Sequence, residues 1–331
     1  MQTLPAGGGL VQRDAANNGS IVDVPGVAVG HAHDLAARTG CTVVVLERGG
    51  VCGVDVRGSA PGTRETDCLA PTGHVETVHA LVLSGGSAFG LDAACGVMQV
   101  LEQRGIGFAV GDFRIPIVPA AVLFDLLVGD GHVRPDAAMG AAAARAASTA
   151  PPAEGRVGVG AGATVAKLAG PLRARDSGVG TASARHGELV VAALAVANAV
   201  GAIFDPRTGE PVALPQPEGD EPYDARAMLA LWGRLPAAGT NTTLAVVATN
   251  ANLRRAGATK LAQMAHDGLA RVVVPAHLSL DGDTIFACGT GGVDAPLDLI
   301  GTMAAEVVAE ALLRGVRLGA AAGASASRPR V

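Results

Sequence analysis

Short, almost purely apolar segments separated by glycine-rich turns constrain the fold of this chain most. Such segments, rich in Val, Leu, Ile and Ala, lie at 41–46, 80–83, 189–200, 244–248, 271–274 and 284–287. Apolar runs of this length between turn residues are typical of buried β-strands. Helical spacing of apolar residues predicts helices ending at Leu101 and over 118–128, 137–148, 229–231, 253–265 and 297–313. The alternation predicts a layered α/β or α+β body.

Composition predicts one large core. Hydrophobic residues make up 49% of the 331 residues and charged residues 17%, which is enough apolar material for a single domain over residues 1–331. Aromatic residues reach 2% and glycine occupies 46 positions. We therefore expect a core of small aliphatic side chains joined by tight turns.

Charge and cysteine usage argue against several classes of partner. The net charge is −5 and the basic residues are scattered, so neither nucleic acid nor a membrane surface is expected as a partner. The apolar run 189–204 is interrupted by Asn198 and is too short to span a bilayer comfortably. The first twenty residues show no secretory signal, and the five cysteines form no C-x-x-C motif. A cytoplasmic location is expected.

Weaker patterns give further expectations. His31 and His33 could share a strand face, but two histidines without a thiol or carboxylate cluster make a poor metal site, so no metal and no cofactor are expected. Residues 156–163 predict a glycine-rich strand edge, and 158–163 match a dinucleotide fingerprint poorly. Residues 205–226 predict an exposed loop, and the tail from Gly319 predicts disorder.

The segment Gly-Thr-Asn-Thr-Thr-Leu at 239–244 leads from a polar loop into a buried strand. Composition alone makes it a strand start. Together with Ser-Ala-Pro-Gly-Thr-Arg-Glu-Thr-Asp at 59–67 and Leu-Ser-Gly-Gly-Ser-Ala-Phe-Gly-Leu at 83–91, it resembles the L-aminopeptidase D-Ala-esterase/amidase family of self-cleaving N-terminal-nucleophile hydrolases. Over roughly residues 23–292 the chain is most similar to the nylon-oligomer (6-aminohexanoate-oligomer) hydrolases of that family.

This resemblance implies an α+β fold, a four-layer αββα sandwich. It also implies self-cleavage between Asn241 and Thr242, giving a large subunit 1–241 and a small subunit 242–331 that stay together, and assembly as a homotetramer. Thr242 becomes the nucleophile, with Thr240 and Thr243 as alternatives one position away. The chemistry is coherent, because a free α-amine with a pKa of about 7.7 to 8.0 can accept the hydroxyl proton of its own residue.

The resemblance carries two further residues to this chain. Lys167 would lie near the nucleophile, where its charge disfavours protonation of the amine; the alternative is a solvated surface lysine. Asn198 lies within an apolar run, and a buried amide requires hydrogen-bond partners. It could donate to a developing oxyanion, or it could form a structural hydrogen bond to the backbone.

Two aspartates separate the branches of the family. Asp281 and Asp283 match the paired acids of the nylon hydrolases, where the β-aminopeptidase branch has Ser and Glu. Their implied role is to orient the hydroxyl and amine of Thr242; the alternative is a plain Asp-Gly turn. Phe124 stands where nylon hydrolases have a tyrosine, so we expect an apolar substrate contact there.

These features predict an amidohydrolase that cleaves linear amide oligomers such as 6-aminohexanoate oligomers through an acyl-enzyme on Thr242. Three alternatives remain open. The chain could be an aminopeptidase for D- or β-amino acid N-termini. It could be an acyl transferase resembling ornithine acetyltransferase, or an uncut binding protein.

Overall fold

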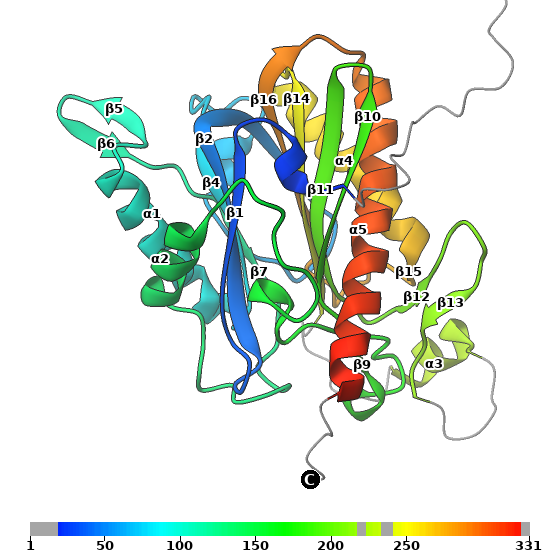
Figure 1. Cartoon of the computed structure of the whole chain (residues 1–331). Helices are drawn as coiled ribbons and strands as arrows, with labels where there is room; N and C mark the ends of the chain where they lie inside the picture. The colour runs from blue at the N-terminus through cyan, green and yellow to red at the C-terminus, as the bar shows by residue number, and fades with distance from the viewer. Residues whose placement is uncertain (1–18, 217–222, 233–240, 326–331) are drawn as a thin grey trace, which may run out of the picture.

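The structure is a computed structural model that describes residues 19–216, 223–232 and 241–325 (Figure 1). Its α-helices are α1 Ala93–Gln103, α2 Ala137–Ala146, α3 Ala225–Trp232, α4 Arg255–Val272 and α5 Leu297–Ser325. Its strands are β1 Val27–Asp34, β2 Thr39–Val56, β3 Gly62–Arg64, β4 Val78–Ser84, β5 Phe108–Val110, β6 Phe113–Ile115, β7 Ala120–Val122, β8 Thr164–Val165, β9 Arg175–Asp176, β10 Val179–His186, β11 Leu189–Asn198, β12 Ala202–Phe204, β13 Pro211–Ala213, β14 Thr242–Ala251, β15 Val273–Val274 and β16 Thr284–Val293. Short 3-10 helices are η1 Ile21–Asp23, η2 Asp67–Leu69, η3 Ser87–Asp92, η4 Gly158–Gly160 and η5 Pro171–Arg173.

Strand β2 joins the two halves of the sheet. The strand order is β10-β11-β14-β16-β2-β4-β7-β3, with β1 also paired to β2. The first part of β2 pairs with β1 and β4, whereas its last part, from Val51 to Val56, pairs with β16. The register with β4 shifts between Val45 and Gly50, and such irregularities bend a strand. One long strand therefore serves both sheet layers.

Figure 1 shows two layers of strands between helices α1 and α2 on one side and helices α4 and α5 on the other. Three clusters of buried side chains lie between these four layers. One cluster joins α4 and α5 to β11, β14 and β16, and another joins α1 and α2 to β2 and β4. The third lies between the sheets, where Val44 and Leu83 share a cluster with Leu194, Val246 and Phe286. The predicted α+β fold, a four-layer αββα sandwich, is confirmed.

Burial on both faces explains the continuous apolar runs. Along β2, Val43 belongs to the cluster under the helices, while Val44 belongs to the cluster between the sheets. Successive side chains of a strand point to opposite faces. Because each sheet has a helix layer on one face and the other sheet on the opposite face, both sets of positions are apolar.

Two expected elements are wrong. Residues 118–128 form no helix: Ala120–Val122 is β7, which is parallel to β4 and fully buried. A short buried apolar run fits a strand as well as a helix. Residues 156–163 are not a strand edge, because Gly158–Gly160 is a 3-10 turn with Gly158 at φ +52°.

Two expectations about irregular segments also need correction. Within 205–226, the described part includes β13, which pairs with β12, and the start of α3; residues 217–222 lie outside the described residues. The tail from Gly319 is not disordered throughout, because α5 continues to Ser325. Residues 326–331 lie outside the described residues.

The hairpin β5–β6 has one apolar, exposed face. Phe108 pairs with Ile115 and Val110 with Phe113, so these four side chains share that face, and each is at least 42% exposed.

None of the helices in the described parts of the chain is long and apolar enough to cross a membrane.

Candidate active site

Thr242 is the first residue of β14, in the middle of the sheet. It lies opposite Asn198, the last residue of the neighbouring strand β11. The preceding residue, Asn241, forms an isolated parallel bridge with Asp281. All four residues are buried, with at most 4% of their surface exposed. Sheet register therefore brings together four of the residues expected at the site.

The carbonyl oxygen of Asn241 accepts two short hydrogen bonds. The Thr242 hydroxyl donates to it at 2.6 Å, and the main-chain N–H of Gly282 donates to it at 2.8 Å. Hydrogen-bond donors that point at a carbonyl oxygen stabilise the negative charge that develops there when a nucleophile adds. The peptide bond before Thr242 is thus polarised by a donor on the opposite segment.

Gly282 has no room for a side chain. A Cβ there would lie 2.7 Å from both Thr242 Oγ1 and the Ala60 carbonyl oxygen. The motif at 59–67 begins behind this segment, where Ala60 N donates to the Asp281 carbonyl at 2.9 Å. Sequence reasoning treated the Asp-Gly-Asp segment as two acids and missed the glycine between them.

The two aspartates have different partners. Asp283 accepts a hydrogen bond from the main-chain N–H of Thr243 at 2.7 Å, and its other oxygen is bound by His277. Asp281 accepts from Leu278 N at 2.8 Å. Both precede β16 rather than lying in it. Asp283 thus contacts Thr243, the residue after Thr242, and the Thr242 hydroxyl donates to the Asn241 carbonyl. A hydrogen bond from that hydroxyl to either aspartate stays a prediction.

Burial sets the charge of Asp281 and Lys167. Burial, followed by repulsion from Asp283, raises the pKa of Asp281 to about 7. Burial lowers the pKa of Lys167 to about 7, against attraction by Asp281 and Asp125. Each group is partly charged at neutral pH, so a proton can move at the site without an extreme change in pH.

Lys167 is not a solvated surface lysine. The residue is partly exposed along its length, but protein surrounds its ammonium group. Nζ donates to the Asn198 carbonyl at 3.0 Å and to Asn198 Oδ1 at 2.7 Å. The lysine therefore contacts the residue that lies directly opposite Thr242.

Asn198 uses its side chain structurally. Its Nδ2 donates to the carbonyl of Phe124 at 2.9 Å, and its Oδ1 accepts from Thr164 N at 3.0 Å. This is the structural hydrogen bond that the sequence left open. A side-chain amide has two N–H donors, so the second is the one that an oxyanion role would need. That role stays a prediction, as does a substrate contact by the partly buried Phe124.

Asp125 is a buried acid that the sequence analysis missed. It accepts from the Thr39 hydroxyl at 2.8 Å and from Gly86 N at 2.7 Å, and burial raises its pKa. Gly86 belongs to the motif at 83–91, so this carboxyl ties that turn to the loop that carries Phe124. Nothing local in the sequence distinguishes Asp125 from a surface acid.

Residues 19–327 match the family described as peptidase family S58. The chain belongs to peptidase family S58. An uncharacterized aminopeptidase of Mycobacterium tuberculosis is 43% identical over 331 residues, covering 90% of this chain and 93% of that protein. A 6-aminohexanoate-oligomer endohydrolase of Kocuria sp. is 31% identical over 320 residues, covering 89% and 85%. The S58 chain is thus a hydrolase of amide bonds, and the predicted resemblance is confirmed.

Solved structures agree with the S58 fold. A β-aminopeptidase of Burkholderia sp. matches with a TM-score of 0.68 at 24% identity, covering 90% of this chain and 86% of that one. The L-aminopeptidase D-Ala-esterase/amidase of Ochrobactrum anthropi, described as a variant of the Ntn hydrolase fold, matches with a TM-score of 0.68 at 18% identity, covering 92% and 88%. At these identities the likeness concerns the fold.

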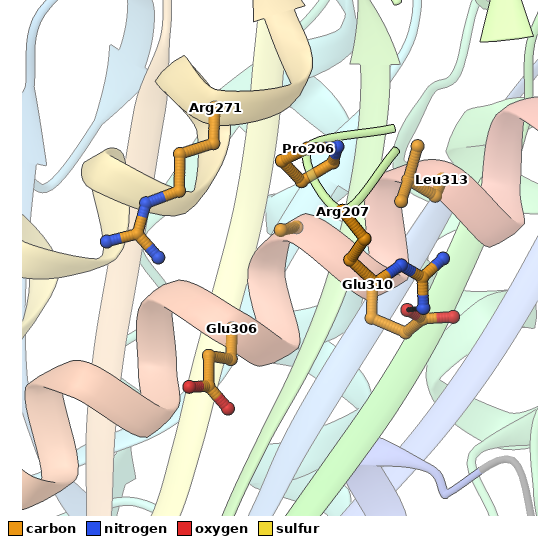
Figure 2. A pocket seen from close by; sticks show the side chains of 7 residues that line it. Pro206, Arg207, Arg271, Glu306, Glu310 and Leu313 are labelled. Atoms are coloured by element: carbon orange, nitrogen blue, oxygen red, sulfur yellow. Dashed lines mark hydrogen bonds and ion pairs between the residues drawn. The ribbon is translucent and has the colours of Figure 1, made fainter. Parts of the chain in front are cut away.

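A cavity of about 250 Å³ on the surface of α5 contains none of the expected site residues of this S58 protein (Figure 2). Pro206, Arg207, Arg271, Glu306, Ala309, Glu310 and Leu313 line it. Arg207 is already paired with Asp205 and Glu310.

In the described part of the chain, no group of three or more His, Cys, Asp or Glu side chains could hold a metal ion.

Proposed function

We propose that this S58 hydrolase cuts itself between Asn241 and Thr242 and then uses Thr242 as an N-terminal nucleophile. The observation that carries this proposal is the carbonyl oxygen of Asn241, which accepts from the Thr242 hydroxyl at 2.6 Å and from Gly282 N at 2.8 Å. The nucleophile and a donor for the oxyanion thus meet at one peptide bond. Neither Thr240, which lies outside the described residues, nor Thr243, whose amide is bound to Asp283, has such support.

The cut proceeds through an ester. The Thr242 oxygen adds to the carbonyl carbon of Asn241, the C–N bond breaks, and the hydroxyl proton passes to the departing Thr242 nitrogen. Water then hydrolyses the ester, which leaves a carboxylate on Asn241 and a free amine on Thr242. Asp281 is suited to relay the proton, because its pKa is about 7 and its buried Oδ1 has no hydrogen-bond partner among the described residues.

Turnover uses the same oxygen. The free α-amine of Thr242 removes the hydroxyl proton, the oxygen attacks the substrate amide, and the protonated leaving amine departs. Water completes hydrolysis of the acyl-enzyme. The charge of Lys167 favours the neutral form of the amine, and the second N–H of Asn198 donates to the oxyanion.

We propose linear amide oligomers, such as 6-aminohexanoate oligomers, as substrates. Support comes from Asp281 and Asp283, which match the pair of acids in the nylon hydrolases. Further support comes from relatives that are 31% identical to this chain and are named 6-aminohexanoate-oligomer endohydrolases. Phe124 would add an apolar contact suited to a methylene chain. The proposal retains a cytoplasmic location and a homotetramer, with the fragments 1–241 and 242–331 held together without a covalent bond.

A second candidate is an aminopeptidase. It is favoured by relatives that are 43% identical and are named aminopeptidases. The two candidates differ in what the site must recognise: an aminopeptidase needs a free N-terminal ammonium, whereas an endohydrolase does not.

Three measurements test the proposal. N-terminal sequencing of the smaller fragment of the purified protein should start at Thr242; a start elsewhere, or an intact chain, would exclude this nucleophile. The cut protein should then be assayed with 6-aminohexanoate oligomers, with the same oligomers acetylated at the N-terminus, and with aminoacyl p-nitroanilides. Hydrolysis of the acetylated oligomer supports the endohydrolase, and loss of activity on acetylation supports the aminopeptidase. Acyl transfer to ornithine in place of water would reveal a transferase.

A further inference from the structure

His277 binds the Asp283 carboxylate twice. Its imidazole Nδ1 lies 2.8 Å from Asp283 Oδ2, and its own main-chain N–H donates to the same oxygen at 3.2 Å. The other oxygen, Oδ1, accepts from Thr243 N at 2.7 Å. The carboxylate thus links His277 to the residue that follows the proposed nucleophile.

The acceptor beside the ring places a proton on Nδ1 of His277. A carboxylate oxygen that accepts a hydrogen bond requires the proton of His277 on Nδ1. The ring of His277 lies edge-on to that of His266, with centroids 4.9 Å apart, and His266 Nε2 donates to the Asp55 carbonyl at 3.1 Å. His277 Nε2 is buried and has no hydrogen-bond partner among the described residues. The imidazole therefore serves Asp283 through one N–H.

The backbone of His277 is strained. Its φ is +57°, a left-handed conformation that favours Gly and Asn over other residues. This conformation lets the main-chain N–H and the side-chain N–H of one residue reach the same oxygen of Asp283. Strain of this kind persists where the surrounding structure requires it. Here the strained residue donates two hydrogen bonds to the buried Asp283 carboxylate, close to the proposed scissile peptide.

We propose that His277 is a positioning residue, which holds the Asp283 carboxylate and through it the amide of Thr243, so that Thr242 stays aligned with the Asn241 carbonyl. This inference rests on the proposed function, and it assigns His277 no contact with substrate. A displacement of about 1 Å in a nucleophile can lower a rate on the order of a hundredfold. The proposal therefore predicts a kinetic defect when the imidazole is removed.

Two substitutions in the full-length chain separate positioning from folding. His277→Gly accepts the left-handed backbone and keeps the main-chain N–H, but it removes the imidazole donor. His277→Asn also tolerates this backbone and restores a side-chain N–H close to the position of Nδ1. His132→Gly removes an exposed imidazole from the segment 1–241, away from the contacts of Asp283, and serves as the control.

Self-cleavage is followed on gels after rapid purification, with thermal unfolding recorded for each variant. We expect His277→Gly to cut at least tenfold more slowly than wild type, while His277→Asn and His132→Gly cut within a few-fold of it. A His277→Gly variant that cuts at the wild-type rate would overturn the positioning role, and so would a folded His277→Asn variant as slow as the Gly variant. A wild-type chain that never cuts would instead refute the proposed function, and the present inference with it.

Discussion

Thr242 and Asn198 lie directly opposite each other across the antiparallel strands β14 and β11. Lys167 donates to both oxygens of Asn198, at 2.7 and 3.0 Å. Sheet register therefore fixes Asn198, the residue that Lys167 binds, relative to Thr242. A slip of one residue would turn every side chain of the strand to the other face and remove the arrangement.

Replacing Thr242 tests the nucleophile. We expect Thr242→Ala to give a folded, uncut and inactive chain, because one hydroxyl serves both the cut and turnover. Thr242→Ser should retain partial function, since it keeps the hydroxyl but loses the β-branch that restricts χ1. Intact mass and amide hydrolysis measure both effects. A Thr242→Ala chain that still cuts would move the nucleophile to Thr240 or Thr243.

Gly282→Ala should block the cut. The added Cβ would lie 2.7 Å from Thr242 Oγ1 and from the Ala60 carbonyl, so the segment that carries the Gly282 N–H must move. Gly257→Ala in α4 is the matched control, because the nearest atom to its Cβ is 4.0 Å away and alanine favours a helix. Gels of both variants suffice. Equal cleavage in the two would remove Gly282 from the mechanism.

Lys167→Met should lower amide hydrolysis at neutral pH by roughly tenfold or more, because without the nearby positive charge the pKa of the Thr242 amine rises by about one unit or more and less of it is neutral. The chain has one other lysine, the exposed Lys260, so Lys260→Met is the natural control. Rates should be measured on protein that is already cut. If both variants retain wild-type rates, Lys167 has no role in turnover.

Asp281 should make stability depend on pH. Burial raises its pKa from 3.8 to about 7, so the folded state favours the protonated form. This contribution is complete below pH 3.8 and is lost as pH rises to about 7. In the uncut Thr242→Ala background, Asp281→Asn should therefore gain stability relative to Asp281 as pH rises through this window. Urea unfolding at several pH values measures the difference; a constant difference would contradict the shifted pKa.

Assembly is expected to be a homotetramer of the two-fragment unit. Light scattering at working concentration, with the Thr242→Ala chain as a comparison, measures the mass. A monomeric mass for the cut protein would contradict the expectation, whereas a tetramer formed by both proteins would show that assembly does not require the cut.

The sequence predicted the layers of the fold and the members of the site, but not all of the contacts within the site. Continuous apolar runs predicted buried strands such as β11 and β14, because burial on both faces leaves a compositional mark. Resemblance of motifs placed Thr242, Lys167, Asn198, Asp281 and Asp283 at one site, and the structure brings them together. The contributions of Gly282, Asp125 and His277 were not predictable, since each depends on partners that register or loop packing supplies. The helix predicted over 118–128 is wrong because a short apolar run suits a strand or a helix equally.

The place of β14 and β16 in the sheet has a consequence for the life of the protein. Both belong to the proposed small fragment, yet they lie between β11 and β2 of the large one. The sheet can therefore be assembled from one continuous chain, in which every strand is tethered to its neighbours. After the cut, the same arrangement would have to be rebuilt from two separate polypeptides, each lacking its central partners. We therefore expect unfolding of the cut enzyme to be irreversible. The lifetime of the active protein is then set by its rate of unfolding.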